Sequence, residues 1–81
     1  MAANKIYTEY CTTDIVLGAT LKVHGFDLIR IDINRNKGAF VFGNVDDSLI
    51  QDFDLGKVRV EPTEFNNAIK SLTTSVRRMI K

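Results

Sequence analysis

The sequence predicts a small α+β domain: an antiparallel sheet of three to four strands, covered on one face by an N-terminal and a C-terminal helix. Apolar residues alternate with polar ones within residues 26–43, which indicates a hairpin of half-buried strands. In residues 15–23 and 65–80 they recur instead at every third or fourth position, as on one face of a helix. The length of 81 residues allows one domain, which we assign to residues 1–81.

The first helix is expected to begin after Thr12, Thr13 and Asp14, because such side chains accept hydrogen bonds from the free N–H groups of a first turn. It should run to about His24, with Gly25 as its stop signal. Its β-branched residues and an internal glycine make it a weak helix in isolation. The residues expected on its buried face are Ile15, Val16, Leu17, Ala19, Leu21 and Val23.

The central hairpin contains the stretch RNKGAFVFGN, in which a basic residue, a glycine and alternating aromatics resemble the base-stacking strand of RNA-recognition motifs. Isoleucines at 29, 31 and 33 define one face of the preceding strand, and Leu28 and Arg30 the other. A two-residue turn at Asn36-Lys37 would pair Phe40 with Ile33 and Phe42 with Ile31, and cross-strand partners share a face. Both phenylalanines are therefore predicted to lie in the core, with base stacking as the alternative.

The second half of the chain is predicted as a helical turn over residues 46–54, a short edge strand over Lys57 to Val60, and a long helix that starts at Glu61-Pro62. Residues 6–10 are a candidate for a further strand. The apolar stripe expected on the long helix consists of Phe65, Ile69, Leu72, Val76, Met79 and Ile80.

Composition excludes several classes of protein. One cysteine and one histidine cannot form an internal disulfide or a four-ligand zinc site, and we expect no cofactor. The longest apolar run, Ala39 to Phe42, is far shorter than the roughly 20 residues of a membrane span. The N-terminus lacks the apolar segment of a signal peptide. We expect a cytoplasmic protein without membrane contact.

Candidate catalytic groups are sparse. His24 is better explained by the negative end of the first helix than by acid-base chemistry, and Cys11 has no third group to orient a Cys-His pair. The acidic residues between 46 and 54 lack the remaining ligands of a calcium loop and are expected to cap helices and remain solvated. We expect no enzymatic activity and infer no small-molecule substrate.

The charge is distributed unevenly along the chain. The net charge is +1, but residues 1–56 hold five basic and eight acidic side chains, whereas residues 57–81 hold six basic and two acidic ones. A basic face on the last helix could bind nucleic acid without sequence specificity, although the pI of about 7.9 is lower than is typical of such domains. The residues of this candidate surface are Lys57, Arg59, Lys70, Thr74, Arg77, Arg78 and Lys81.

Self-association is the other interaction that the sequence suggests. The core of so short a chain is small, and the strand predicted over residues 57–60 lies at an edge. The sheet face opposite the isoleucines is also more apolar than exposure to water requires. A two-fold dimer could bury that face or pair that edge. The residues of this candidate interface are Leu28, Arg30, Ala39 and Val41.

One set of residues resembles a family of small stand-alone domains of unknown function from bacteria, phages and mobile elements. The set is Tyr10-x-Thr12-x-Asp14, Leu17-x-Ala19, Gly25-Phe26-x-Leu28, Phe40-Val41-Phe42, Val60-x-Pro62-x-x-Phe65 and Leu72. The resemblance spans roughly residues 10–80, although the family usually carries Asp at the position of Glu61. It implies the same architecture and a mobile-element origin, and it brings no catalytic residue. The resulting hypothesis is a non-enzymatic accessory protein that binds a protein partner or a second copy of itself.

Overall fold

The computed structural model describes residues 5–80 and confirms the predicted α+β class. Within this range the chain forms three strands and three helices. In chain order they are β1 (Ile6–Thr12), α1 (Ile15–Val23), β2 (Asp27–Asn34), β3 (Lys37–Asp46), α2 (Asp47–Asp54) and α3 (Pro62–Met79).

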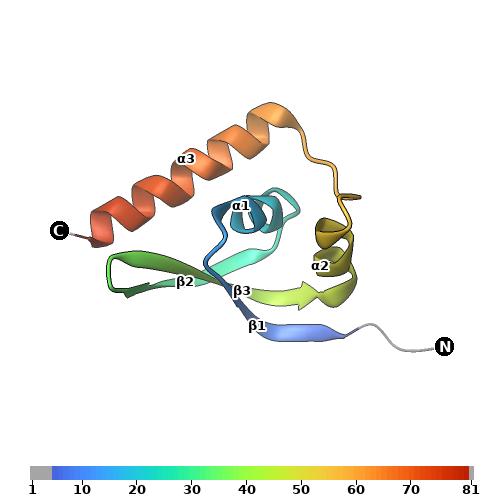
Figure 1. Ribbon diagram of the computed structural model, residues 1–81, viewed down its shortest axis with the longest axis horizontal. Coiled ribbons are helices and arrows are strands. Elements are labelled where there is room, and N and C mark those ends of the chain that lie inside the picture. The colour runs from blue at the N-terminus through green and yellow to red at the C-terminus, as the bar shows by residue number, and fades with distance from the viewer. Residues whose placement is uncertain (1–4, 81) are drawn as a thin grey trace.

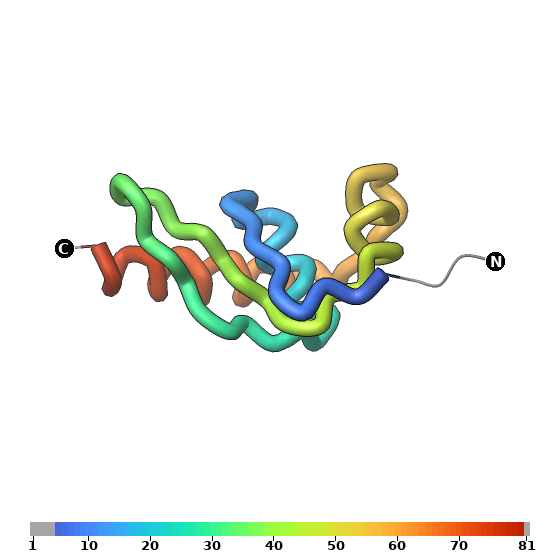
Figure 2. Tube along the Cα trace, turned by 90° about the horizontal axis from the view of Figure 1, so that it is seen from below, coloured from blue at the N-terminus to red at the C-terminus, as the bar shows by residue number. Residues whose placement is uncertain are grey.

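The strands form one antiparallel sheet in the order β1-β3-β2, so β3 is central and the other two are edges. Helix α1 lies between the sheet and α3, and α2 packs beside the end of β3 (Figure 1). The C-terminal end of α3 reaches the tip of the β2–β3 hairpin, and both views place them at the same end of the long axis (Figure 2). Helices α1 and α3 thus lie on one face of the sheet, as predicted for the N-terminal and C-terminal helices.

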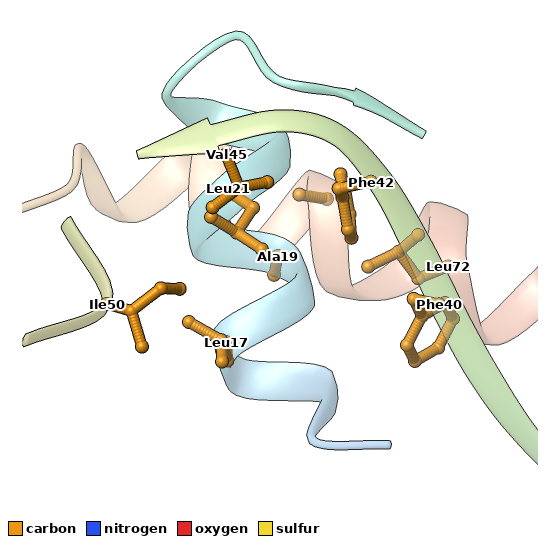
Figure 3. Close-up of a cluster of buried hydrophobic side chains, with 9 residues drawn as sticks. Leu17, Ala19, Leu21, Phe40, Phe42, Val45, Ile50 and Leu72 are labelled. Atoms are coloured by element: carbon orange, nitrogen blue, oxygen red, sulfur yellow. The ribbon is translucent and has the colours of Figure 1, made fainter. Parts of the chain in front are cut away.

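The core fills the space between β3, α1 and α3 (Figure 3). Phe40 and Phe42 are 2% and 0% exposed, which confirms their predicted burial and removes them from any base-stacking surface. The buried cluster consists of Leu17, Ala19, Leu21, Phe40, Phe42, Val45, Ile50, Ala68 and Leu72.

The predicted hairpin register is wrong by two residues. The turn residues are Arg35 and Asn36, both with positive φ (52° and 66°), and Ile31 pairs with Phe40. This is the two-residue turn whose twist suits a hairpin, in which both central residues are left-handed. Because side chains alternate with a period of two, a slip of two residues preserves the face that each strand buries.

A β-bulge in β2 overturns two face assignments. The register shifts between Leu28 and Arg30, so that Leu28 pairs with Phe42 and packs against the core. Ile29 is 48% exposed instead of buried. A bulge places an extra residue in one strand and shifts the alternation beyond it by one. The predicted alternation is therefore correct for Ile31 and incorrect at the start of the strand.

Helix α1 is buried around most of its circumference from Leu17 to Leu21, because the sheet and α3 enclose it from two sides. Val16, predicted on the buried face, is 46% exposed. The internal Gly18 allows close packing: a Cβ there would lie 3.3 Å from Phe40 Cδ2 and 3.5 Å from Leu72 Cδ1. The residue that weakens the isolated helix thus lets α3 and β3 approach it.

The third strand of the sheet is β1, which extends the candidate strand at residues 6–10 to Thr12. The strand predicted over residues 57–60 does not form, and that segment is an irregular connection into α3. Helix starts follow the sequence signals more closely. Asp14, Asp46 and Glu61 each cap a helix by accepting hydrogen bonds from backbone N–H groups of its first turn.

Candidate interaction surfaces

The predicted basic residues are divided between the two ends of α3. Lys57 and Arg59 precede the helix, whereas Arg77 and Arg78 lie in its last turn. Eighteen helical residues span about 27 Å. The candidate set therefore does not form one patch. Lys70 and Thr74 are exposed on the intervening turns, and Lys81 lies outside the described residues.

The hairpin tip adds two cations to the C-terminal end of α3. Gly38 packs against α3 so closely that a Cβ there would lie 2.6 Å from Val76 Cγ2. Lys37 and Arg35 precede Gly38 in the hairpin, and both are exposed. Sequence reasoning missed these two residues because they belong to the acidic part of the chain, and only tertiary packing brings them beside α3. We call Arg35, Lys37, Arg77 and Arg78 the basic end.

A shallow cleft of about 220 Å³ runs along this contact. Arg77 lines it together with the hydroxyl-bearing residues Thr13 and Thr73. A second open cleft, of about 400 Å³, lies between α1 and the first half of α3 and is lined by Lys22, Glu64 and Ser71 among others.

Six of the ten acidic side chains lie toward the opposite end of the molecule. Helix α2 and the start of α3 lie far from the hairpin tip (Figure 1). Asp46 caps α2, and Asp47 accepts hydrogen bonds from the Tyr7 hydroxyl at 2.9 Å and from Gln51 Nε2 at 2.7 Å. Charge is thus uneven in space as well, but the division differs from that along the sequence, because Lys57 and Arg59 lie between α2 and α3 at this acidic end. The acidic residues of this end are Asp46, Asp47, Asp52, Asp54, Glu61 and Glu64.

The outer face of the sheet carries no helix of the described chain (Figure 1). Even so, Val41 on this face is 1% exposed. Arg30 bonds to Asp32 on its own strand and to Glu9 on β1, with its Nη1 3.2 Å from Glu9 Oε2. Since β3 separates β2 from β1, this side chain must cross β3 beside Val41. These hydrogen bonds raise the pKa of the Arg30 guanidinium above its ordinary value, the bond to Glu9 most and the bond to Asp32 next.

The predicted self-association residues therefore lie in four different environments. Leu28 belongs to the inner face, and Val41 is covered. Ala39 is half-buried, and Arg30 is exposed but engaged in its ion pairs. The exposed apolar residue that the structure adds to the outer face is Ile29.

The two edges of the sheet differ in how well they are protected. Strand β2 has a bulge at Ile29 and carries the charges of Asp27, Arg30 and Asp32. Strand β1 has the sequence IYTEYCT, with neither proline nor lysine, and its one charge, Glu9, is held by Arg30. Bulges and charges are the usual devices that prevent a strand from pairing with another chain. Strand β1 has no such register shift and carries only that one charge.

The start of β1 is fixed by α2. The Tyr7–Asp47 hydrogen bond raises the pKa of the Tyr7 hydroxyl, because the bond and the nearby carboxylate favour the protonated form. Burial is the main cause of the raised pKa of Tyr10, whose ring centroid is 5.2 Å from that of Tyr7. Lys5 Nζ lies 4.8 Å from the centre of the Tyr7 ring.

The structure brings none of the candidate catalytic groups together. Exposed Cys11 precedes α1 and exposed His24 is its C-cap, so the whole helix separates them. Among residues 5–80, no group of three or more His, Cys, Asp or Glu side chains could hold a metal ion. Helices of the described part are all too short or too polar to cross a membrane.

No protein-family model matches the sequence, and no curated protein or solved structure matches it at a significant level.

Proposed function

We propose that this chain is a non-enzymatic interaction protein that associates with a second copy of itself through the open edge of β1. The observation that carries the proposal is the difference between the two sheet edges. A bulge and three charged residues protect β2, whereas Ile6–Thr12 presents an unprotected row of backbone hydrogen-bonding groups.

A two-fold axis at β1 would pair two copies antiparallel and join their sheets into one of six strands. Two-fold dimers are the commonest closed assembly, and pairing identical edges leaves no further β1 edge free. The dimer would also add buried surface to a small core. Ile6, which is 53% exposed at the start of β1, would lie at this contact.

The proposed non-enzymatic role and cytoplasmic location depend on other features of the chain. Separation of Cys11 from His24 supports a non-enzymatic role, and the exposed thiol of Cys11 suits the reducing cytoplasm. The resemblance to small bacterial and phage domains supports an accessory role of mobile-element origin.

Light scattering at micromolar concentration tests the dimer. We expect a mass of about twice 9.1 kDa for the chain. Thr8→Lys places a lysine on the exposed part of β1 and should yield monomers, because a lysine at an edge discourages pairing. Thr74→Lys is the matched control: it makes the same substitution on the exposed surface of α3 and should remain dimeric.

Two outcomes would overturn the proposal. A mass of 9.1 kDa for the unmodified chain would show that the β1 edge does not pair with itself. A dimer that persists in Thr8→Lys, with an unchanged circular dichroism spectrum, would place the interface elsewhere.

A further inference from the structure

We infer that the basic end is a binding surface for the phosphate backbone of nucleic acids. It is separate from the β1 edge, so it stands independently of self-association. Its four cations come from two elements far apart in the sequence, the hairpin tip and the last turn of α3, which the packing of Gly38 on Val76 brings together.

The cations of the basic end are available to a ligand. All four residues are exposed, and the ion pairs within 4 Å in residues 5–80 involve Arg30 instead. Helix α2 and the start of α3, which carry the acidic group of the opposite end, lie away from the hairpin tip (Figure 1). Phosphates approaching the basic end are therefore remote from that acidic group. Asp14 adjoins the cleft residues Thr13 and Ile15, and its carboxylate accepts hydrogen bonds from the N–H groups of Val16 and Leu17.

The conformation of Arg35 is the second observation. Its φ of 52° is left-handed, and the turn that it forms with Asn36 favours Asn, Asp or Gly at both positions. Asn36 follows that preference and Arg35 does not. An unfavourable residue at an exposed turn points to a role other than folding. Attraction to the helix C-terminus could account for Arg77 and Arg78, but it does not account for an arginine at the hairpin tip.

An extended polyanion fits this surface better than a single anion does. The cations are spread over the tip and the helix end instead of converging on one cavity, so a chain of phosphates can contact more of them than one phosphate can. Three of the four are arginines, whose planar guanidinium suits phosphate oxygens. The apolar face of α3 is packed against α1 and the sheet, except for Met79, which was predicted on that face and is 51% exposed. One exposed methionine is far smaller than the apolar face with which an amphipathic helix enters lipid.

Binding should lack sequence specificity. The buried phenylalanines of β3 provide no stacking platform, and contacts to phosphate carry no sequence information. Four contacts to duplex DNA would give a slope of about −3.6 in a plot of log affinity against log salt.

Fluorescence anisotropy with a labelled DNA duplex and a labelled single-stranded RNA, over a salt series, tests the inference. Arg77→Glu/Arg78→Glu should weaken binding by about tenfold or more and flatten the salt slope by about 2. Lys57→Glu/Arg59→Glu is the matched control, because it changes the net charge equally at the opposite end of α3. It should change the affinity by less than about twofold if contact at the basic end, and not overall charge, governs binding.

Arg35→Asn separates binding from folding. Asparagine tolerates the left-handed conformation, so this variant should melt at the same or a higher temperature while it binds nucleic acid more weakly. Unchanged affinity in Arg35→Asn would show that Arg35 at the hairpin tip does not take part in binding nucleic acid. No binding at low salt, or an equal loss in the Lys57/Arg59 control, would overturn the inference. Tighter binding to anionic phosphatidylserine vesicles than to either nucleic acid would assign the basic end to a membrane surface instead.

Discussion

Phe42 and Val41 are adjacent residues on opposite faces of β3, and they are equally buried by different surroundings. Phe42 on the inner face is 0% exposed and Val41 on the outer face is 1% exposed. Phe42 belongs to a cluster of apolar side chains from α1, α3 and the sheet (Figure 3). Val41 is covered without any helix, next to one exposed, ion-paired arginine. Equal exposed fractions therefore do not imply equal contributions to stability.

Two glycines of β3 also differ in how freely their nearest side-chain neighbours can move. A Cβ at Gly38 would lie 2.6 Å from Val76 Cγ2, a branched side chain on a packed helix. A Cβ at Gly43 would lie 3.0 Å from Ile29 Cδ1, the far end of a side chain that is 48% exposed. The inner neighbour has little room to move, and the outer neighbour can turn toward solvent.

The largest expected effect comes from removing a ring from the inner face. Phe42→Ala should lower the free energy of unfolding by about 3 to 5 kcal/mol, because it leaves a cavity among packed side chains. Val41→Ala, its neighbour on the outer face, should cost about 1.5 kcal/mol, near the transfer value of two methylene-sized groups. Denaturant titration measures both. Equal losses in the two variants would mean that the faces are packed alike.

Adding a methyl group should have a smaller effect, again with a difference between the faces. Gly38→Ala should destabilise by about 1 to 3 kcal/mol through its clash with Val76. In a Val76→Ala background the same substitution should cost much less, because the clashing methyl groups are gone. Gly43→Ala is the control on the outer face and should change stability by less than about 1 kcal/mol. A Gly38→Ala cost that Val76→Ala does not relieve would point to backbone strain in the strand.

The sequence predicted those features that depend on neighbouring residues. Capping side chains located the helix starts, and alternation placed Phe40 and Phe42 on the buried face despite an error of two residues in the turn. The bulge at Ile29 was missed, although the consecutive apolar residues Leu28 and Ile29 interrupt the strict alternation at that point. That single extra residue moved Leu28 into the core.

The interaction surfaces were less predictable than the fold. The strand expected at residues 57–60 has the right alternation, yet the sheet ends at β1 and β2, and the long helix begins immediately afterwards. Arg35 and Arg77 lie 42 positions apart, and only the packing of the hairpin under α3 places them at one end of the molecule. Charge counted along the chain cannot show such a grouping.

The smallest expected effect concerns the arginine that crosses the outer face. The side chains of Arg30, Glu9 and Asp32 are about half exposed, and ion pairs of this kind contribute roughly 0 to 1 kcal/mol. Arg30→Met keeps an aliphatic stem beside Val41 and removes the charge, so it should cost less than about 1 kcal/mol, and the difference should shrink at high salt. Arg30→Ala removes the stem as well and should cost more, because Val41 then meets water. Thermal melts of both variants at low and high salt separate the two contributions. If Arg30→Met and Arg30→Ala prove equally destabilising, Arg30 contributes to stability through its ion pairs alone. Val41 is then kept from water by Ile29 and the neighbouring strands.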